Sequence, residues 1–286
     1  MRIEFTKMQG IGNDYIVIDC LGGEPPDPSL LAVQISRRRF SVGADGVILV
    51  CRSEAADVKM RIFNADGSEA GMCGNGIRCV GKFVYDRGIK RSRYLSVETL
   101  AGIKHLELTV GNDGCVTSVK VDMGRADFSP AGVPVISDEP VINRPLTVLG
   151  QTYNITCLSV GNPHAAVFVP GDLDLLDIVR VGPAFERHII FPERTNAEFV
   201  RVISRNVIHM RVWERGSGET LACGTGTCAV VAAAARLGLC DFNTPVTVKL
   251  PGGKLVVVCD RDYQMTMEGP AATVYEGIYE YSLPGA

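Results

Sequence analysis

Cys73-Gly74-Asn75-Gly76 and Cys223-Gly224-Thr225-Gly226 decide the fold, because the second stretch repeats the first at an offset of 150 residues. The match extends without a gap to the preceding segments, where Met60-Arg61-Ile62-Phe63 corresponds to Met210-Arg211-Val212-Trp213. In both copies a glycine-rich turn leads into a segment with helical spacing of apolar residues. The repeat therefore predicts two similar domains, each with a cysteine at the entry to a helix.

Length and charge exclude several classes of protein. The chain has 286 residues, enough for two domains of ordinary size. Its formal net charge of -3 gives no basic surface for nucleic acid. The longest apolar run, 229–235, is far shorter than the roughly 20 residues that span a bilayer. Residues 1–7 carry scattered charges instead of the apolar core of a signal peptide. We expect a cytoplasmic protein with no nucleic-acid or membrane partner.

The ten cysteines do not form a recognisable metal or disulfide pattern. Six lie among apolar residues, where a cysteine is usually a small buried hydrophobic side chain: Cys20, Cys51, Cys115, Cys157, Cys240 and Cys259. The spacings Cys73/Cys79 and Cys223/Cys228 lack the remaining ligands of a zinc site. No strand-linked dinucleotide fingerprint is evident either. We expect neither a metal nor a cofactor.

Hydrophobic patterning predicts mostly strands in both halves of the chain. In the first half we expect strands at 47–50, 58–63, 94–97, 103–110 and 116–123, a helix over 30–39, and a second helix from Asn75 to Gly88. In the second half we expect strands at 155–160, 196–202, 207–213, 246–250, 254–258 and 264–268, a short helix that includes 184–188, and a helix after Gly224. The alanine-rich segment 229–235 should be buried on nearly all sides.

These elements predict an α+β fold with two pseudo-symmetric domains. Each is expected to be a curved, mostly antiparallel, barrel-like sheet around a central helix, with the active site in the cleft between them. The N-terminal domain covers 1–126 and the C-terminal domain 127–269, with the proline-rich segment 127–144 as the linker. Three tyrosines and two β-branched residues in 274–281 predict a strand that returns to the first domain, so 270–286 is assigned there.

The two cysteine turns combine features that suit proton transfer. The first amides of a helix have no internal partners, and the helix dipole favours negative charge there. We therefore expect the pKa of both thiols to fall toward neutrality, and the amides at Gly74-Asn75 and Gly224-Thr225 to hold a carboxylate. A thiolate and a thiol on opposite faces of a carbon could remove and replace its proton. The alternative is two buried cysteines at tight turns with no catalytic role.

Polar residues recur at matched positions around these turns. Asn13 and Asn162 lie in corresponding glycine turns, and Asn64 corresponds to Glu214, nine residues before each cysteine. Asparagine in turns often serves the backbone alone, and that interpretation stays open for each of them. Glu214 is followed by Arg215, and an adjacent acid and base suit the ammonium and carboxylate of an amino acid.

Asn196 and His164 are two further polar positions that we expect near these turns. Asn196, in Arg194-Thr195-Asn196, corresponds loosely to Asp45. His164 follows Pro163 in the second glycine turn, where it could tune a thiol or brace the loop. We favour a supporting role for this histidine over direct proton transfer.

Taken together, these motifs resemble the diaminopimelate epimerase family. The likeness covers essentially the whole chain in family order, with motifs at 8–14, 63–70, 72–79, 161–164, 194–196, 213–216 and 222–226. The resemblance implies a cofactor-independent isomerase that converts LL-2,6-diaminopimelate to meso-2,6-diaminopimelate in lysine and peptidoglycan precursor synthesis. It also implies an enzyme that closes two domains over an amino-acid substrate and forms a homodimer.

The resemblance also assigns roles to residues. Cys73 and Cys223 match the two catalytic acid/base cysteines, and His164 matches a histidine beside the site. The matched substrate-binding positions are Asn13, Asn64, Gly74, Asn75, Asn162, Asn196, Glu214, Arg215, Gly224 and Thr225. The chain departs from the family pattern in one loop. Many members carry a glutamine there, and this chain has Ala44-Asp45-Gly46 instead.

Other functions fit parts of the pattern. A proline racemase or a broader amino-acid racemase would share the two cysteines. Proline racemases typically have a histidine after the first Cys-Gly, however, and this chain has Asn75 there. An isomerase of the phenazine-biosynthesis type lacks the paired cysteines. Outside these isomerases, Cys73 and Cys223 could form a reversible disulfide in a thiol redox protein, or the chain could be a non-catalytic amino-acid-binding module.

Overall fold

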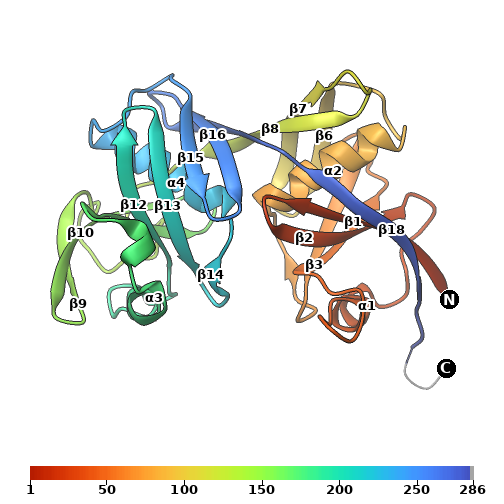
Figure 1. Cartoon of the computed structure of the whole chain (residues 1–286), viewed down its shortest axis with the longest axis horizontal. Coiled ribbons are helices and arrows are strands. Elements are labelled where there is room, and N and C mark those ends of the chain that lie inside the picture. The colour runs from red at the N-terminus through yellow and green to blue at the C-terminus, as the bar shows by residue number, and fades with distance from the viewer. Residues whose placement is uncertain (284–286) are drawn as a thin grey trace. The chain divides into compact units, whose positions relative to one another are not determined.

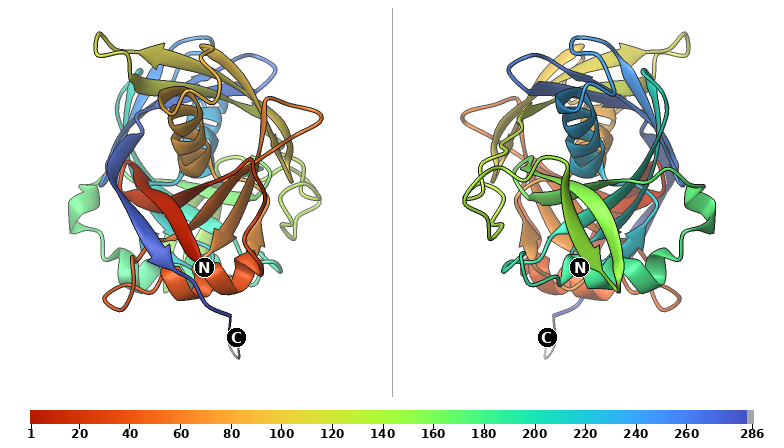
Figure 2. Two further views of the ribbon diagram at one scale, coloured as in Figure 1. Left: turned by 90° about the vertical axis from the view of Figure 1, so that its right-hand side faces the viewer. Right: turned by 90° about the vertical axis from the view of Figure 1, so that its left-hand side faces the viewer.

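The computed structural model describes residues 1–283, and the chain divides into two compact units. Unit 1 contains Met1–Val121 and the described residues from Gly269 onward, and unit 2 contains Asp122–Glu268. Each unit is built mainly of strands around one long helix, which is α2 (Gly74–Asp86) in unit 1 and α4 (Gly224–Arg236) in unit 2. Figure 2 shows each helix enclosed by strands of its own unit. The predicted α+β class is confirmed, and residues 284–286 of the predicted returning segment lie outside the described residues.

The strands of unit 1 pair in the order β18-β1-β2-β3-β4-β6-β7-β8 (Figure 1). All neighbours are antiparallel except the pairs β2–β3 and β4–β6. The strands are β1 (Arg2–Gly10), β2 (Asn13–Cys20), β3 (Gly46–Cys51), β4 (Val58–Asn64), β5 (Glu69–Ala70), β6 (Tyr94–Thr99), β7 (Gly102–Val110), β8 (Val116–Arg125) and β18 (Ala272–Glu280). The short β5 pairs with β4, and the last residues of β8 belong to unit 2.

Unit 2 has the same pairing pattern, in the order β9-β10-β11-β12-β13-β15-β16-β17. Parallel pairs again occur at the third and fifth positions, as β11–β12 and β13–β15. The strands are β9 (Arg144–Val148), β10 (Gln151–Ser159), β11 (Pro163–Phe168), β12 (Asn196–Ser204), β13 (Val207–Glu214), β14 (Gly218–Thr220), β15 (Val246–Leu250), β16 (Gly253–Cys259) and β17 (Gln264–Gly269). The strand β18 therefore takes in unit 1 the place that β9 takes in unit 2.

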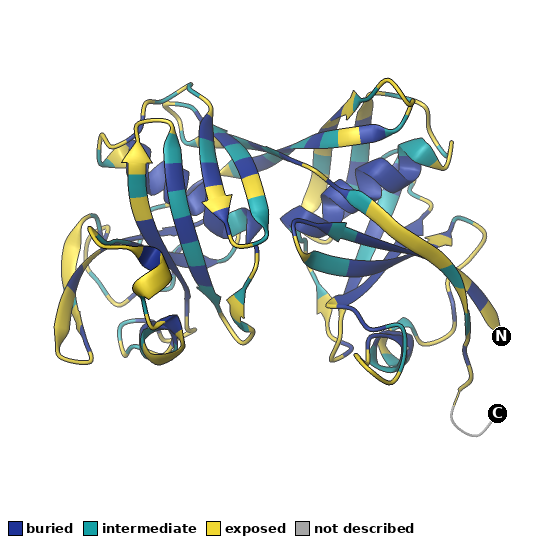
Figure 3. Ribbon diagram, in the orientation of Figure 1, coloured by how far each residue is buried: buried dark blue, intermediate teal, exposed yellow. Residues whose placement is uncertain are grey.

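The central helix of unit 2 is buried on nearly all sides, as predicted for its alanine-rich segment. Every residue from Thr227 to Ala235 is buried, and most of these side chains are single methyl groups. Figure 3 shows the same burial for most of α2 and α4. Small side chains allow the surrounding strands to approach the helix closely, so α4 is held in place along its length.

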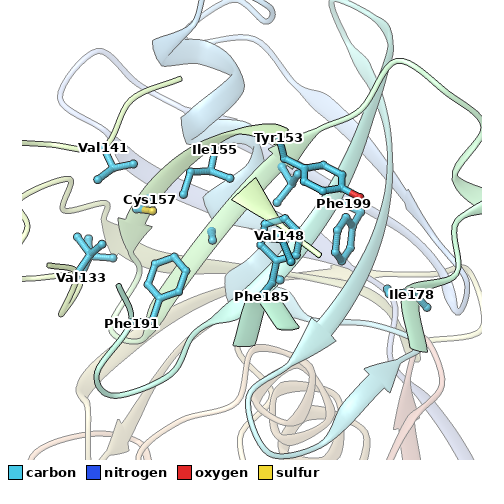
Figure 4. Packing of buried hydrophobic residues seen from close by; sticks show 14 of the residues in the cluster. Val133, Val141, Val148, Tyr153, Ile155, Cys157, Ile178, Phe185, Phe191 and Phe199 are labelled. Atoms are coloured by element: carbon cyan, nitrogen blue, oxygen red, sulfur yellow. The ribbon is translucent and has the colours of Figure 1, made fainter. Parts of the chain in front are cut away.

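A second core of unit 2 lies under α3 (Ile178–Glu186). Phe185 contacts Tyr153 and Phe199 edge-to-face, with ring centroids 5.2 and 5.3 Å apart (Figure 4). Val133 and Val141 from the predicted linker pack into the same cluster. The segment 127–144 is therefore a packed part of unit 2 rather than a free connection.

Two helices differ from their predicted bounds, and strands β2, β9 and β11 were not predicted. Helix α1 spans Pro28–Ile35 instead of 30–39, because the amides of Gly43 and Ala44 take up the carbonyls of Ile35 and Ser36 and turn the chain away. Helix α3 spans Ile178–Glu186 and ends before His188. Strand β2 was not predicted, because its polar start resembles a continued turn.

Candidate active site

Both cysteines cap the helix that follows them. Cys73 precedes α2 and Cys223 precedes α4, each with an extended backbone. The sulfur atoms accept hydrogen bonds from the amides of Gly76 and Gly226 at 3.4 and 3.3 Å. This geometry places each thiol in the positive field of a helix N-terminus, next to the first helical amides.

In unit 1, the Cys73 thiol lies in a small polar cluster. The Tyr15 hydroxyl is 3.0 Å from Cys73 Sγ and donates to Asn13 Oδ1 at 2.8 Å. Asn75 Nδ2 donates to the same Asn13 oxygen at 3.3 Å, and Asn13 Nδ2 donates to Asp45 at 2.6 Å. Burial, and next the Cys73 thiol, raise the pKa of Tyr15 well above its usual value, so this hydroxyl is neutral. The structure thus brings Asn13, Asn75 and Cys73 together.

Asn64 lies at the end of β4, opposite Gly46 of β3. Its side-chain amide donates to Ser68 Oγ at 2.9 Å in the turn before β5. A Cβ atom on Gly46 would lie 2.4 Å from the carbonyl oxygen of Phe63, so the backbone leaves no room for any side chain there. Any side chain at position 46 would therefore clash with this backbone, and within residues 1–283 the side-chain hydrogen-bond partner of Asn64 is Ser68.

Strand register corrects one of the predicted correspondences. Tyr15 pairs with Gly46 between β2 and β3, and His164 pairs with Asn196 between β11 and β12. The counterpart of Asn196 is therefore Gly46, and not Asp45 as the sequence suggested. The same register makes Tyr15 the counterpart of His164.

In unit 2, the Cys223 thiol is buried beside carboxyl groups. Its side chain is 5% exposed and lies 3.5 Å from the Thr225 hydroxyl. Burial first, and then the charges of Glu214 and Glu198, raise the pKa of Cys223 well above its usual value. The predicted fall in pKa is therefore wrong for this thiol, because desolvation and two carboxylates outweigh the helix dipole.

Glu214 and Arg215 point to different partners although they are adjacent in sequence. The Glu214 carboxyl accepts a hydrogen bond from Thr220, and burial raises its pKa. The Arg215 guanidinium donates to the carbonyl of Glu193, while its backbone amide donates to Asn196 Oδ1 at 2.8 Å. Asn196 thus fixes the backbone that carries Arg215.

His164 joins two other polar residues in the interior of unit 2. Its Nε2 atom is 2.9 Å from Asn162 Oδ1, and its Nδ1 atom is 2.6 Å from Glu198 Oε1. The side chains of His164 and Glu198 are both fully buried. The predicted residues Asn162 and His164 are therefore in contact, and Glu198 was missed by the sequence analysis.

Comparison with known proteins identifies the family. The model of the diaminopimelate epimerase family matches residues 5–129 and 156–274. The diaminopimelate epimerase of Acetivibrio thermocellus is 50% identical over 277 residues, which cover 96% of this chain and 98% of that protein. That of Methanococcus maripaludis is 48% identical, with 96% and 99% covered. The chain belongs to the diaminopimelate epimerase family.

Membership of the diaminopimelate epimerase family makes the chain an isomerase, as predicted. Solved structures of more distant proteins share its fold. A Bacillus anthracis protein of the phenazine-biosynthesis PhzF family superposes with a TM-score of 0.72 at 21% identity, covering 98% of this chain and 100% of that one. A hydroxyproline epimerase from Agrobacterium vitis gives a TM-score of 0.73 at 16% identity, covering 99% and 94%.

The structure also places two residues beside the site, Tyr15 and Glu198, that the motifs of the diaminopimelate epimerase family did not identify. Tyr15 and Glu198 lie beside the matched motif residues, and Tyr15 occupies in unit 1 the strand position that His164 occupies in unit 2. Within residues 1–283, no cluster of three or more His, Cys, Asp or Glu side chains is placed to hold a metal ion. No helix of that described part is long and apolar enough to cross a membrane.

The burial of Cys223 predicts unequal reactivity of the two thiols. We expect iodoacetamide to alkylate the half-buried Cys73 before Cys223 at pH 7.5, because only a thiolate attacks and the raised pKa keeps Cys223 protonated. Labelling of Cys223 should remain slow until the pH is raised well above 9. Peptide mass spectrometry measures both sites, with half-buried Cys115 as the reference. Faster labelling of Cys223 at pH 7.5 would contradict this expectation.

The close approach at Gly46 predicts a cost for any side chain. Gly46→Ala should lower the free energy of unfolding by about 1–3 kcal/mol, because the new methyl group overpacks against the Phe63 carbonyl. Gly22→Ala is the matched control, since a Cβ atom at Gly22 would meet no neighbouring atom within 4 Å. Urea unfolding compares the two variants, and equal stabilities would show that β3 and β4 separate easily.

Proposed function

We propose that this protein epimerises LL-2,6-diaminopimelate to meso-2,6-diaminopimelate with Cys73 and Cys223 as the two acid/base groups. The observation that carries the proposal is the paired arrangement of thiols, each capping a helix at the same place in its unit. One thiolate removes the α-proton from one face, and the other thiol delivers a proton to the opposite face. The proposal requires both thiols to reach one α-carbon.

The different surroundings of the thiols suggest their resting states. Cys223 is held as a thiol by burial and by its carboxyl neighbours, so it starts as the proton donor. Cys73 starts as the base, since its sulfur accepts from Gly76 N–H at the helix N-terminus and it is the other thiol, Cys223, whose pKa burial and two carboxyl groups raise. After one turnover Cys73 carries the proton and Cys223 is the thiolate, and exchange with solvent or the reverse reaction resets the pair.

The remaining predicted residues have roles in binding. The first amides of α2 and α4, at Gly74-Asn75 and Gly224-Thr225, are suited to the carboxylate beside the reacting carbon, where they stabilise the carbanion. The side chains that bind the two amino-acid groups of the substrate are those of Asn13, Asn64, Asn162, Asn196, Glu214 and Arg215. Cytoplasmic location and a homodimer remain predictions from the sequence.

The activity is tested with stereochemically pure substrate and no added cofactor. Incubation with LL-2,6-diaminopimelate should give meso-2,6-diaminopimelate, measured by chiral chromatography, while L-proline and trans-4-hydroxy-L-proline stay unchanged. Conversion of a proline substrate without conversion of diaminopimelate would instead indicate the activity of a proline racemase or hydroxyproline epimerase. No conversion of any substrate would favour a redox or binding role instead.

A further inference from the structure

The interior of unit 2 contains a carboxyl group that the proposed chemistry does not use. Glu198 lies in β12 and its side chain is fully buried. Its Oε1 atom is 2.6 Å from His164 Nδ1, whereas its Oε2 atom has no hydrogen-bond partner among the described residues. A buried carboxyl group with one unsatisfied oxygen costs folding free energy, so a functional reason for it is needed.

Glu198 lies directly against the first turn of α4. A Cβ atom on Gly226 would be 2.7 Å from Glu198 Oε1 and 3.2 Å from Cys223 Sγ. The same glycine therefore separates the carboxyl group from the thiol, and its amide is the one that bonds the sulfur. The charge of Glu198 raises the pKa of Cys223, after burial and Glu214, and that of Cys157 on β10, after burial.

Unit 1 provides an internal comparison, because it has no charge at the matching place. Ile48 is the residue 150 positions before Glu198, and a Cβ atom on Gly76 would lie 3.0 Å from Ile48 Cδ1. An apolar side chain therefore suffices to support the helix turn below Cys73. The fold does not demand a carboxyl group at this position.

We propose that Glu198 is a positioning residue of the Cys223 half of the site. By accepting a hydrogen bond from His164 Nδ1–H it fixes the orientation of the imidazole ring, whose Nε2 atom lies in contact with the Asn162 side-chain amide. Its negative charge next to the α4 turn also favours the protonated form of Cys223. The two units therefore differ at this position, with Ile48 in unit 1 and Glu198 in unit 2, and the difference lets Cys223 begin the reaction as the acid. The catalytic part of this role rests on the proposed epimerisation, whereas the hydrogen bond to His164 and the effect on the Cys223 thiol do not.

Two substitutions separate the hydrogen bond from the charge. Glu198→Gln keeps an oxygen that accepts from His164 and removes the charge, while Glu198→Ile copies unit 1 and removes both. Val200→Ala is the matched control, because Val200 is buried two residues further along the same face of β12.

Two measurements test the role without substrate. The slowly exchanging His164 Nδ1–H proton should be visible by NMR in the unchanged protein, in Glu198→Gln and in Val200→Ala, and it should be lost in Glu198→Ile. Alkylation of Cys223 at pH 8 should be at least about tenfold faster in both Glu198 variants than in Val200→Ala.

Kinetics with diaminopimelate supply the third measurement. Glu198→Gln should lower kcat about tenfold with little change in KM, and Glu198→Ile should also raise KM because Asn162 is no longer held. If both Glu198 variants match Val200→Ala in the NMR, alkylation and kinetic measurements, the proposal is overturned. If the unchanged protein has no activity with diaminopimelate, the proposed function fails while the NMR and alkylation results still decide the role of Glu198.

Discussion

Replacing either Cys73 or Cys223 by alanine is expected to reduce kcat for epimerisation by about 10²–10⁴-fold or more, the contribution of a positioned acid or base. A two-base reaction has no route to the opposite stereoisomer when one of its proton carriers is missing. The double variant should be no slower than the slower single variant, because the two thiols act as one unit. Rates come from chiral chromatography of initial product.

The neighbouring cysteines on the same helices are the matched controls. Cys79 and Cys228 are completely buried in α2 and α4, one to two turns after the capping residues. Cys79→Ala and Cys228→Ala remove a sulfur from the same helices and should leave kcat within about threefold, since neither caps a helix N-terminus. Full activity in either Cys73→Ala or Cys223→Ala would refute the two-thiol mechanism.

Replacing Arg78 by methionine should destabilise unit 1 by about 2–5 kcal/mol, because the buried Gly74 carbonyl and the Pro270 carbonyl both lose a charged donor. Arg78 is completely buried in α2. Its Nη1 atom donates to the Gly74 carbonyl at 2.9 Å and its Nε atom donates to the Pro270 carbonyl at 3.2 Å. The side chain therefore links the first turn of the helix to the segment that leads into β18.

Arg87 on the same helix provides the control for this prediction. It ends α2 and pairs with Glu276 at 2.7 Å, with its side chain 43% exposed. Arg87→Met should cost about 0–1 kcal/mol, as is usual for an exposed ion pair. Urea unfolding followed by circular dichroism measures both variants. A loss of stability in Arg78→Met no larger than that in Arg87→Met would show that Arg78 does not hold the chain end.

The sequence repeat was enough to predict the architecture of the two units. Apolar runs predicted the buried strands β3 and β4, strand-like runs predicted β6–β8, and the alanine-rich segment predicted the buried helix α4. Helix α1 ended earlier than its pattern suggested, because the amides of Gly43 and Ala44 in the following loop bond the carbonyls of Ile35 and Ser36. Such hydrogen bonds from a loop leave no periodic signal in the sequence.

Side-chain environments were less predictable than positions in the repeat. The motifs located both thiols at helix N-termini, but the pKa of Cys223 depends on carboxyl groups from β12 and β13, which only the folded unit brings to it. Glu198 stands in an apolar strand, where alternation alone does not reveal whether one acid faces the core or the solvent. The available signal was the contrast with Ile48 in the repeat.

The proposed two-base mechanism is tested most directly by isotope exchange at early conversion. Protiated LL-2,6-diaminopimelate is incubated with the enzyme in deuterated water, and substrate and product are separated and analysed by mass spectrometry. The account predicts one deuterium in nearly all of the meso product and almost none in the recovered LL substrate, because the donor thiol carries a solvent-derived proton while the other thiol retains the substrate proton. Product that retains the substrate's α-hydrogen would contradict it, because a single group would then be moving the same proton between the two faces.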